Sequence, residues 1–257
     1  MSSAPGNLPL AGKMALITGG SGGIGAACAR SFIADGASVT LRGRRLEALI
    51  ATRRLLEGEL TQGATIELFA GDVFDQGDIV AAVELAASIH DTLDIAVASV
   101  GGGAIRPLLL HDFDTFRSEL EGNILSSFMM IRYAAAAMMK SGSGSVFCIS
   151  SDAAKLTFPW LSGYTSGKAG LDGVVRAAAE ELSRYDIRVN AVRPGLTRTD
   201  ATAGLFEDPR ISEAFAAENP LGRLGEPEDI AAGIRYLAGP ESSWVTGQSF
   251  SIEGGNE

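Results

Sequence analysis

The chain has 257 residues, of which 46% are hydrophobic and 20% charged, and its formal net charge is −10 at pH 7. This profile is typical of a globular protein with one large or two small domains. The acidic balance argues against a nucleic-acid-binding protein and against docking on an anionic membrane, since both need basic surfaces. Two cysteines and two histidines predict neither a disulfide framework nor a metal site.

The N-terminal stretch MSSAPGNLPLAGK lacks the basic start and apolar run of a signal peptide. Arg132 interrupts the most apolar helical stretch, SSFMMIRYAAAAMMK, so no membrane span is predicted. We therefore expect a cytoplasmic protein.

Short runs rich in Val and Ile alternate along the chain with longer segments of helical periodicity. The predicted strands are 14–18, 38–41, 65–70, 94–100, 145–150, 187–192 and 249–252. The predicted helices lie around 24–35, 45–60, 76–90, 112–140, 163–185 and 227–238. Most of the strands are continuous apolar runs, which indicates a parallel sheet buried on both faces. The alternation predicts an α/β fold with a Rossmann-type, doubly wound parallel β-sheet flanked by helices.

No linker or internal repeat divides the chain, so residues 1–257 are predicted to form a single dinucleotide-binding and catalytic domain. The one long irregular connection, at about 195–226, follows a strand end. A long loop in a compact domain is usually functional, and this one is predicted to be a substrate loop.

A glycine-rich turn separates the first predicted strand from the first predicted helix. Gly19, Gly23 and Gly25 follow the pattern G-x-x-x-G-x-G, and the turn also contains Ser21, Gly22 and Ile24. Without Cβ atoms the backbone can approach a pyrophosphate, while the helix N-terminus supplies unpaired N–H groups. Glycines are common in tight turns, but this strand–turn–helix position favours nucleotide binding.

Tyr164 and Lys168 lie four positions apart on a predicted helix and therefore share one face. A chance pair is one interpretation, and a general acid tuned by a cation is the other. An ammonium ~4 Å from the phenol, at an effective dielectric of about 20, contributes about 4 kcal/mol. This equals about 3 pK units, so Lys168 is expected to bring the pKa of Tyr164 near neutrality.

Two polar residues upstream of this pair are further candidates. Ser151 follows the strand SVFCIS, where its hydroxyl could hydrogen-bond a carbonyl oxygen that develops negative charge. Serines at strand ends are ordinary, however, and Ser150 is an equal neighbour. Asn123 lies within a predicted helix, where an asparagine is more often solvated or locally bonded.

The motif TGGSGGIG resembles the T-G-x-x-x-G-x-G signature of the short-chain dehydrogenase/reductase family. Asn123, Ser151, Tyr164 and Lys168 occur in that family's order and spacing, with the serine thirteen positions before the tyrosine. The resemblance covers about Leu10 to Gly255, and the chain resembles 3-oxoacyl-ACP-reductase-like members of the family.

The resemblance implies a role for each of the four residues. Tyr164 would be the general acid/base, Ser151 would orient the carbonyl group, and Lys168 would bind the nicotinamide ribose. Asn123 would bend its helix and hold a water that relays protons toward the lysine. The C-terminal segment RLGEPEDIAAGIRYLAGPESSWVTGQSFSIEGG resembles the part of the family that usually builds a tetramer interface, which implies a homotetramer or homodimer.

Further matches concern the cofactor. The segment VRPGLTRTD resembles the family's Pro-Gly-x-x-x-Thr stretch beside the nicotinamide, and Asp72 and Val73 match its adenine site. These matches and the loop after the fourth strand give the cofactor candidates Asp72, Val73, Gly101, Tyr164, Lys168, Pro194, Gly195, Thr197 and Thr199. The chain departs from the family at Ala98–Gly101, which reads ASVG where Asn-Asn-Ala-Gly is common. Ser99 is expected to replace part of the missing hydrogen bonding.

The stretch VTLRGRRLEAL concentrates arginines at the end of the second predicted strand. An NAD site places an acid there for the ribose hydroxyls, whereas this chain has Gly43, Arg44 and Arg45 and no carboxylate before Glu47. A guanidinium supplies paired donors for a 2′-phosphate. A solvated basic face is the alternative. The pattern favours NADP(H) over NAD(H), with Arg44 as the principal contact.

The leading hypothesis is an NADP(H)-dependent oxidoreductase that interconverts a ketone and a secondary alcohol. A non-catalytic NADP(H)-binding sensor or scaffold on the same fold is the alternative from another class, and an epimerase or dehydratase is a third. The substrate is expected to be a hydrophobic small-molecule carbonyl compound. A 3-oxoacyl thioester, a steroid and a small cyclic ketone all remain open.

Overall fold

A computed structural model describes residues 8–61, 63–156 and 158–255 of the chain. In these residues the strands form one parallel sheet in the order β3-β2-β1-β4-β5-β6-β7, which confirms the doubly wound fold. The strands are β1 (Met14–Thr18), β2 (Ser38–Gly43), β3 (Ile66–Ala70), β4 (Ile95–Ala98), β5 (Gly144–Ile149), β6 (Ile187–Pro194) and β7 (Ser249–Ile252). Residues 1–7, 62, 157 and 256–257 of the predicted domain lie outside the described residues.

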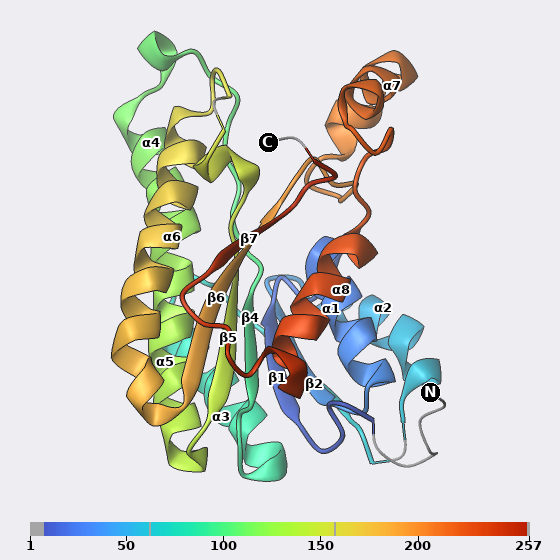
Figure 1. Cartoon of the computed structure of the whole chain (residues 1–257), viewed down its shortest axis with the longest axis vertical. Helices are drawn as coiled ribbons and strands as arrows, with labels where there is room; N and C mark the ends of the chain where they lie inside the picture. Colours follow the sequence, from blue (N-terminus) through green and yellow to red (C-terminus); the bar gives the residue numbers. More distant parts are fainter. Residues whose placement is uncertain (1–7, 62, 157, 256–257) are drawn as a thin grey trace.

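Helices cover both faces of the sheet (Figure 1). One face carries α1 (Gly23–Ala34), α2 (Leu46–Leu56) and α8 (Pro227–Ala238), and the other carries α3 (Gln76–His90), α5 (Ser126–Ser141) and α6 (Ser162–Leu182). Two shorter helices, α4 (Phe113–Leu120) and α7 (Pro209–Glu218), lie at the end of the molecule shown uppermost. None of the described helices is long and apolar enough to cross a membrane.

Short 3₁₀ turns connect several of these elements. They are Glu57–Glu59, Leu108–Leu110, Asp152–Ala154, Ser183–Tyr185, Ala203–Phe206 and Pro240–Ser242.

The strands are continuously apolar because each sheet face has its own core. Ala15 and Ile17 of β1 pack with α1 and α8, whereas Met14 and Leu16 pack with α3 and α5. All five residues of β1 are buried. Alternate side chains of one strand therefore serve opposite cores, so both sets must be apolar.

The predicted helix 112–140 is interrupted in the structure. Helix α4 ends at Leu120, a π-helical segment spans Glu121–Leu125, and α5 begins at Ser126. The side-chain Nδ2 of Asn123 donates to the carbonyl of Glu119 at 2.7 Å and so competes with backbone donors for that acceptor. Such π-bulges frequently mark functional sites.

The prediction that residues 195–226 are irregular is wrong in part, because the segment contains the 3₁₀ turn Ala203–Phe206 and helix α7. The side chain of Asp208 caps α7 by accepting from the N–H of Arg210 at 2.9 Å, and Pro209 occupies the first turn. An N-cap aspartate followed by proline is a helix-start signal that the sequence already contained.

Candidate active site and cofactor site

The four catalytic candidates come from three segments at the carboxyl end of the central strands. Tyr164 and Lys168 lie on α6, Ser151 follows β5, and Asn123 lies in the π-helical segment. The Ser151 side chain hydrogen-bonds Tyr164, and the Lys168 ammonium lies 5.7 Å from the centre of the Tyr164 ring. Ser151 Oγ also accepts from the N–H of Ala153 at 3.1 Å, which leaves the hydroxyl proton to be donated.

Lys168 is buried, with 3% of its surface exposed. Its Nζ donates to the carbonyl of Ile149 at 2.7 Å. Burial disfavours the charged form and lowers the pKa of Lys168 from 10.5 to about 8. The ammonium is therefore near its own titration range at mildly alkaline pH.

The pKa of Tyr164 does not follow the expectation from the Tyr–Lys spacing. Burial raises it above the ordinary value of 10, while the hydrogen bond with Ser151 lowers it and the charge of Asp152 raises it. Lys168 Nζ lies 5.7 Å from the centre of the ring, one of its N–H groups donates to the carbonyl of Ile149, and its charge is not among the causes of the shift. The expectation that Lys168 brings this phenol near neutrality is therefore wrong for this structure, and Tyr164 is protonated at neutral pH.

Asp152, next to Ser151, adds a second buried acid to the site. Burial and a hydrogen bond with the Glu253 side chain raise the pKa of Asp152 from 3.8 to about 8. The carboxyl group is therefore largely neutral at pH 7. Above pH 8 the carboxylate is charged, and this charge contributes to the raised pKa of Tyr164.

Asn123 is fully buried and joins α4 to the loop after β4. Besides its bond to Glu119, Nδ2 donates to the carbonyl of Gly102 at 2.8 Å, and Oδ1 accepts from the Gly102 N–H at 3.2 Å. Gly101 has φ +156°, and a Cβ there would clash with Asn123 Oδ1 and come within 2.7 Å of Lys168 Nζ. Gly101 thus permits the loop to approach both catalytic candidates.

The segment ASVG, where the chain departs from the family pattern, is hydrogen-bonded to Thr18 at the end of β1. Thr18 Oγ1 accepts from the backbone N–H of Ser99 at 3.1 Å and donates to the carbonyl of Val97 at 3.3 Å. The bond that Ser99 contributes here comes from its main-chain N–H, so any residue except proline at that position retains it.

The glycine turn is suited to an anion. Gly19 has φ +68° and packs against the carbonyl of Ser99, and Gly25 packs against Gly19. The N-cap of α1 is Gly22, and the first turn carries no acidic residue. No side chain caps these N–H groups, so they and the positive end of the helix dipole are available to a phosphate-sized group. This arrangement fits a dinucleotide pyrophosphate.

The segment after β6 lies beside this turn. The side chain of Thr199 packs against Gly23, where a Cβ would lie only 3.2 Å from it. Gly195 donates its N–H to the carbonyl of Ile252 at 3.0 Å, and Thr197 Oγ1 donates to the carbonyl of Gly195 at 2.9 Å. Pro194 is the last residue of β6.

Among the remaining candidates of the turn, Ser21 and Ile24 make contacts within the protein. The carbonyl of Ser21 accepts from Thr52 Oγ1 at 3.1 Å, and Ile24 packs against the core on the α1 side.

At the end of β2 the arginines divide into two kinds. Arg44 and Arg45 are exposed just before α2, and Gly43 is buried with space for a Cβ limited by Leu49 at 3.3 Å. Arg42 is fully buried, and its Nη2 donates to the carbonyl of Asp72 at 2.6 Å.

The fixed position of Arg42 was missed from the sequence, although strand alternation placed it on the opposite face from Gly43. Its register partner is Phe69 of β3, whose ring centre lies 6.0 Å from the guanidinium. Burial lowers the pKa of Arg42, while the nearby Asp78, Asp72 and Asp75 raise it. Arg42 thereby holds the loop that contains Asp72 and the buried Val73.

These features define a class of protein: an α/β oxidoreductase with a dinucleotide site at the switch point of a parallel sheet. A family model described as enoyl-(acyl carrier protein) reductase matches residues 19–257. The 7alpha-hydroxysteroid dehydrogenase of Escherichia coli K12 is 33% identical over 249 residues, which are 97% of this chain and 96% of that protein. The 3-oxoacyl-[acyl-carrier-protein] reductase of Chlamydia muridarum is 31% identical over 249 residues, which are 97% of this chain and 99% of that protein.

Solved structures agree with these similarities. A 7alpha-hydroxysteroid dehydrogenase complexed with NADH and 7-oxo glycochenodeoxycholic acid has a TM-score of 0.91 at 32% identity, covering 99% of this chain and 98% of that one. A short-chain type dehydrogenase/reductase from Mycobacterium ulcerans has a TM-score of 0.92 at 34% identity, covering 96% and 90%. The chain belongs to the short-chain dehydrogenase/reductase family. It is therefore an oxidoreductase of a family that binds a nicotinamide cofactor and acts on small molecules.

Proposed function

We propose that the protein interconverts a ketone and a secondary alcohol with NADP(H). The observation that carries this proposal is the contact of Ser151 with Tyr164, with buried Lys168 against the same ring. When bound, the nicotinamide supplies the hydride for reduction or accepts it in oxidation. Ser151 hydrogen-bonds the carbonyl oxygen where negative charge develops. Tyr164 donates its proton to that oxygen, since its raised pKa keeps the phenol protonated at neutral pH.

We assign Lys168 to the nicotinamide ribose and to stabilising the phenolate that remains after proton transfer. Asn123, fixed between Gly102 and Glu119, is assigned to the proton path that restores the phenol. In the oxidation direction the same groups act in reverse, with Tyr164 as the base.

The proposed preference for NADP(H) over NAD(H) rests on the end of β2. A cation at a helix N-terminus is destabilising by about 0.3–1 kcal/mol, because it opposes the helix dipole. An anion bound between Arg44 and Arg45 would offset this cost, which supports a phosphate ligand at the start of α2. Arg42 is buried against Asp72 and cannot turn to a phosphate without leaving that carbonyl. Arg44 is therefore the proposed 2′-phosphate ligand.

We propose a hydrophobic carbonyl compound as substrate. The relatives named above include enzymes of hydroxysteroids and of 3-oxoacyl groups. Ile105 and Trp160 are apolar and more than half exposed near the start of α6, where the N–H of Arg106 donates to the carbonyl of Trp160 at 2.8 Å. We further propose a homotetramer or homodimer, supported by the exposed Trp244 and Tyr236 in the C-terminal region. The buried free thiols of Cys28 and Cys148 support a reducing, cytoplasmic location.

The test is oxidation of NADPH and of NADH against 3-oxoacyl thioesters, steroids and simple ketones. Tyr164→Phe is expected to abolish turnover while NADPH binding persists, and Tyr185→Phe, in the 3₁₀ turn that follows α6, is the matched control. Retained activity of Tyr164→Phe overturns the catalytic assignment. Tight NADPH binding without turnover of any compound favours the sensor or scaffold instead.

A further inference from the structure

A buried histidine–glutamate pair lies beside the catalytic candidates. His111 precedes α4 and Glu119 lies in its last turn; their side chains are 2% and 7% exposed. His111 Nε2 and Glu119 Oε2 are 3.4 Å apart, and among the described residues neither atom has a hydrogen-bond partner of its own. The imidazole also contacts Phe116 edge to face, with ring centres 5.7 Å apart.

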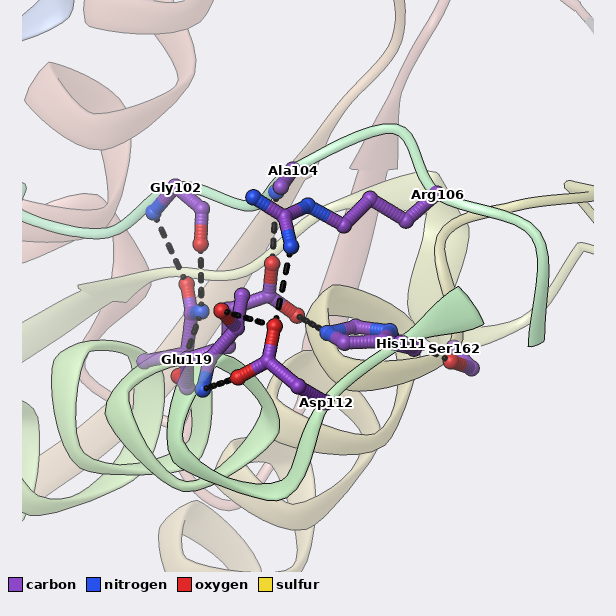
Figure 2. Close-up of polar contacts among 9 residues, drawn as sticks. Gly102, Ala104, Arg106, His111, Asp112, Glu119 and Ser162 are labelled. Atoms are coloured by element: carbon purple, nitrogen blue, oxygen red, sulfur yellow. Dashed lines mark hydrogen bonds and ion pairs between the residues drawn. The ribbon is translucent and has the colours of Figure 1, made fainter. Parts of the chain in front are cut away.

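Each member of the pair reaches a different segment of the site (Figure 2). Glu119 Oε1 accepts from the backbone N–H of Ala104 at 2.5 Å, and His111 Nδ1 is hydrogen-bonded to Ser162 Oγ at 3.1 Å. Ala104 belongs to the loop after β4, and Ser162 is the first residue of α6. The pair therefore links α4, this loop and the start of the helix that carries Tyr164.

The loop held by Glu119 touches the catalytic candidates directly. A Cβ at Gly103 would lie 2.5 Å from the Cβ of Tyr164, so the backbone of Gly103 packs against that residue. Gly102 exchanges two hydrogen bonds with the side chain of Asn123. A displacement of Ala104 would therefore also move Gly103 and Gly102, which contact Tyr164 and Asn123.

Stability alone does not account for this pair. Replacing both partners of a buried polar contact by apolar side chains of the same shape can be nearly neutral or stabilising. What Glu119 supplies that an apolar residue cannot is a directed acceptor for the Ala104 N–H.

We propose that Glu119 is a positioning residue for the reaction, which with His111 fixes the Gly102–Ala104 loop against Tyr164 and Asn123. The proposal rests on the proposed catalytic role of Tyr164. The positioning of the loop depends on the acceptor oxygen of Glu119 and on its polar contact with His111. It does not depend on the negative charge of the carboxylate. Glutamine retains both polar groups, whereas leucine retains only the volume.

Gly163 gives an independent means of disturbing the pair. A Cβ there would clash with Glu119 Oε2 and come within 3.2 Å of His111 Cε1. Gly173 lies on the same helix, and a Cβ there would meet Arg176 Nη2 at an ordinary 3.8 Å. Gly163→Ala and Gly173→Ala are therefore a matched pair that leaves Glu119 itself intact.

The first measurement is amide hydrogen exchange of Ala104 in the full-length protein, which requires no substrate. Glu119→Leu and Gly163→Ala are expected to accelerate exchange at Ala104 at least tenfold, while Glu119→Gln, Gly173→Ala and the exposed Ser118→Ala retain wild-type protection. Unchanged protection of Ala104 in Glu119→Leu would overturn the proposal.

The second measurement is steady-state reduction of the best carbonyl compound from the panel above. Glu119→Leu and Gly163→Ala are expected to lose about tenfold in kcat with an unchanged dissociation constant for NADPH. Glu119→Gln is expected to recover wild-type kcat. A loss that glutamine does not rescue, or that extends equally to NADPH binding, would overturn the positioning role. If Tyr164→Phe is active in the same assay, the proposed function fails instead, so the two failures are distinguishable.

Discussion

The ammonium of Lys168 donates a 2.7 Å hydrogen bond to the backbone carbonyl of Ile149. Ile149 is the last residue of β5, and Ser151 follows two positions later. One bond therefore ties the helix that carries Tyr164 to the strand end that carries Ser151. The relative placement of Tyr164, the proposed acid/base, and Ser151, the proposed hydrogen-bond donor to the substrate carbonyl, depends on this contact.

The loop after β4 should tolerate a methyl group at Gly102 but not at the preceding Gly101. In Gly101→Ala, the new Cβ would meet Asn123 Oδ1 and Lys168 Nζ at a φ of +156°, which disfavours any other residue. We expect kcat/KM to fall at least tenfold. At Gly102 a Cβ would meet no described atom within 4 Å, so Gly102→Ala should retain activity. Steady-state kinetics of the two variants make the comparison, and equal activities would contradict it.

Arg44 should distinguish the two nicotinamide cofactors. Because a charge-assisted hydrogen bond is worth about 1.5–3 kcal/mol, Arg44→Ala should raise the KM for NADPH by roughly 10- to 100-fold. The KM for NADH should change little, since NADH has no 2′-phosphate. Arg45→Ala is the neighbouring exposed control and is expected to have the smaller effect. Equal effects of Arg44→Ala on both cofactors would return the cluster to a solvated basic surface.

Arg42 should act on both cofactors alike. Arg42→Met retains much of the buried volume but releases the carbonyl of Asp72. Because that loop is the proposed adenine contact, the affinities for NADH and NADPH should weaken by the same factor, on the order of tenfold. Fluorescence titration of the free enzyme with each cofactor measures the two constants. A selective loss of NADPH affinity would identify Arg42 as the phosphate ligand in place of Arg44.

The fold was predictable because the physical signals were local and repeated. Continuous apolar strands indicated a sheet covered on both faces, and β1 packs into two cores as that pattern requires. The spacing of Tyr164 and Lys168 likewise placed both on one face of α6. Helix α7 was missed because a long polar connection was read as a loop, although Asp208 and Pro209 mark a helix start.

The missed parts of the site depend on burial and long-range contacts. The pKa of Tyr164 is raised because the phenol is buried and lies near the charge of Asp152, and neither fact follows from an i, i+4 spacing. His111 and Ser162 are far apart in the sequence but hydrogen-bonded in the fold. Such contacts are set by how α4 packs on α6, which local patterns do not encode.

Lys168 should make stability depend on pH in a way that a variant can isolate. The pKa of Lys168 is about 8 in the folded protein, below its ordinary 10.5, so between these values the unfolded chain binds more protons. The free energy of unfolding should therefore rise with pH across this range, by about 3 kcal/mol in total. Below pH 8 both states are protonated, and this slope vanishes.

Lys168→Met removes the titrating group, so its unfolding free energy should lack the rise between pH 8 and 10. Urea denaturation of wild type and variant at pH 7, 8, 9 and 10 measures the difference. Lys140→Met, at an exposed position of α5, is the matched control and should retain the wild-type slope. If Lys168→Met shows the same pH dependence as wild type, the ammonium of Lys168 is not destabilised by burial. Its role in holding α6 to β5 would then rest on the bond to Ile149 alone.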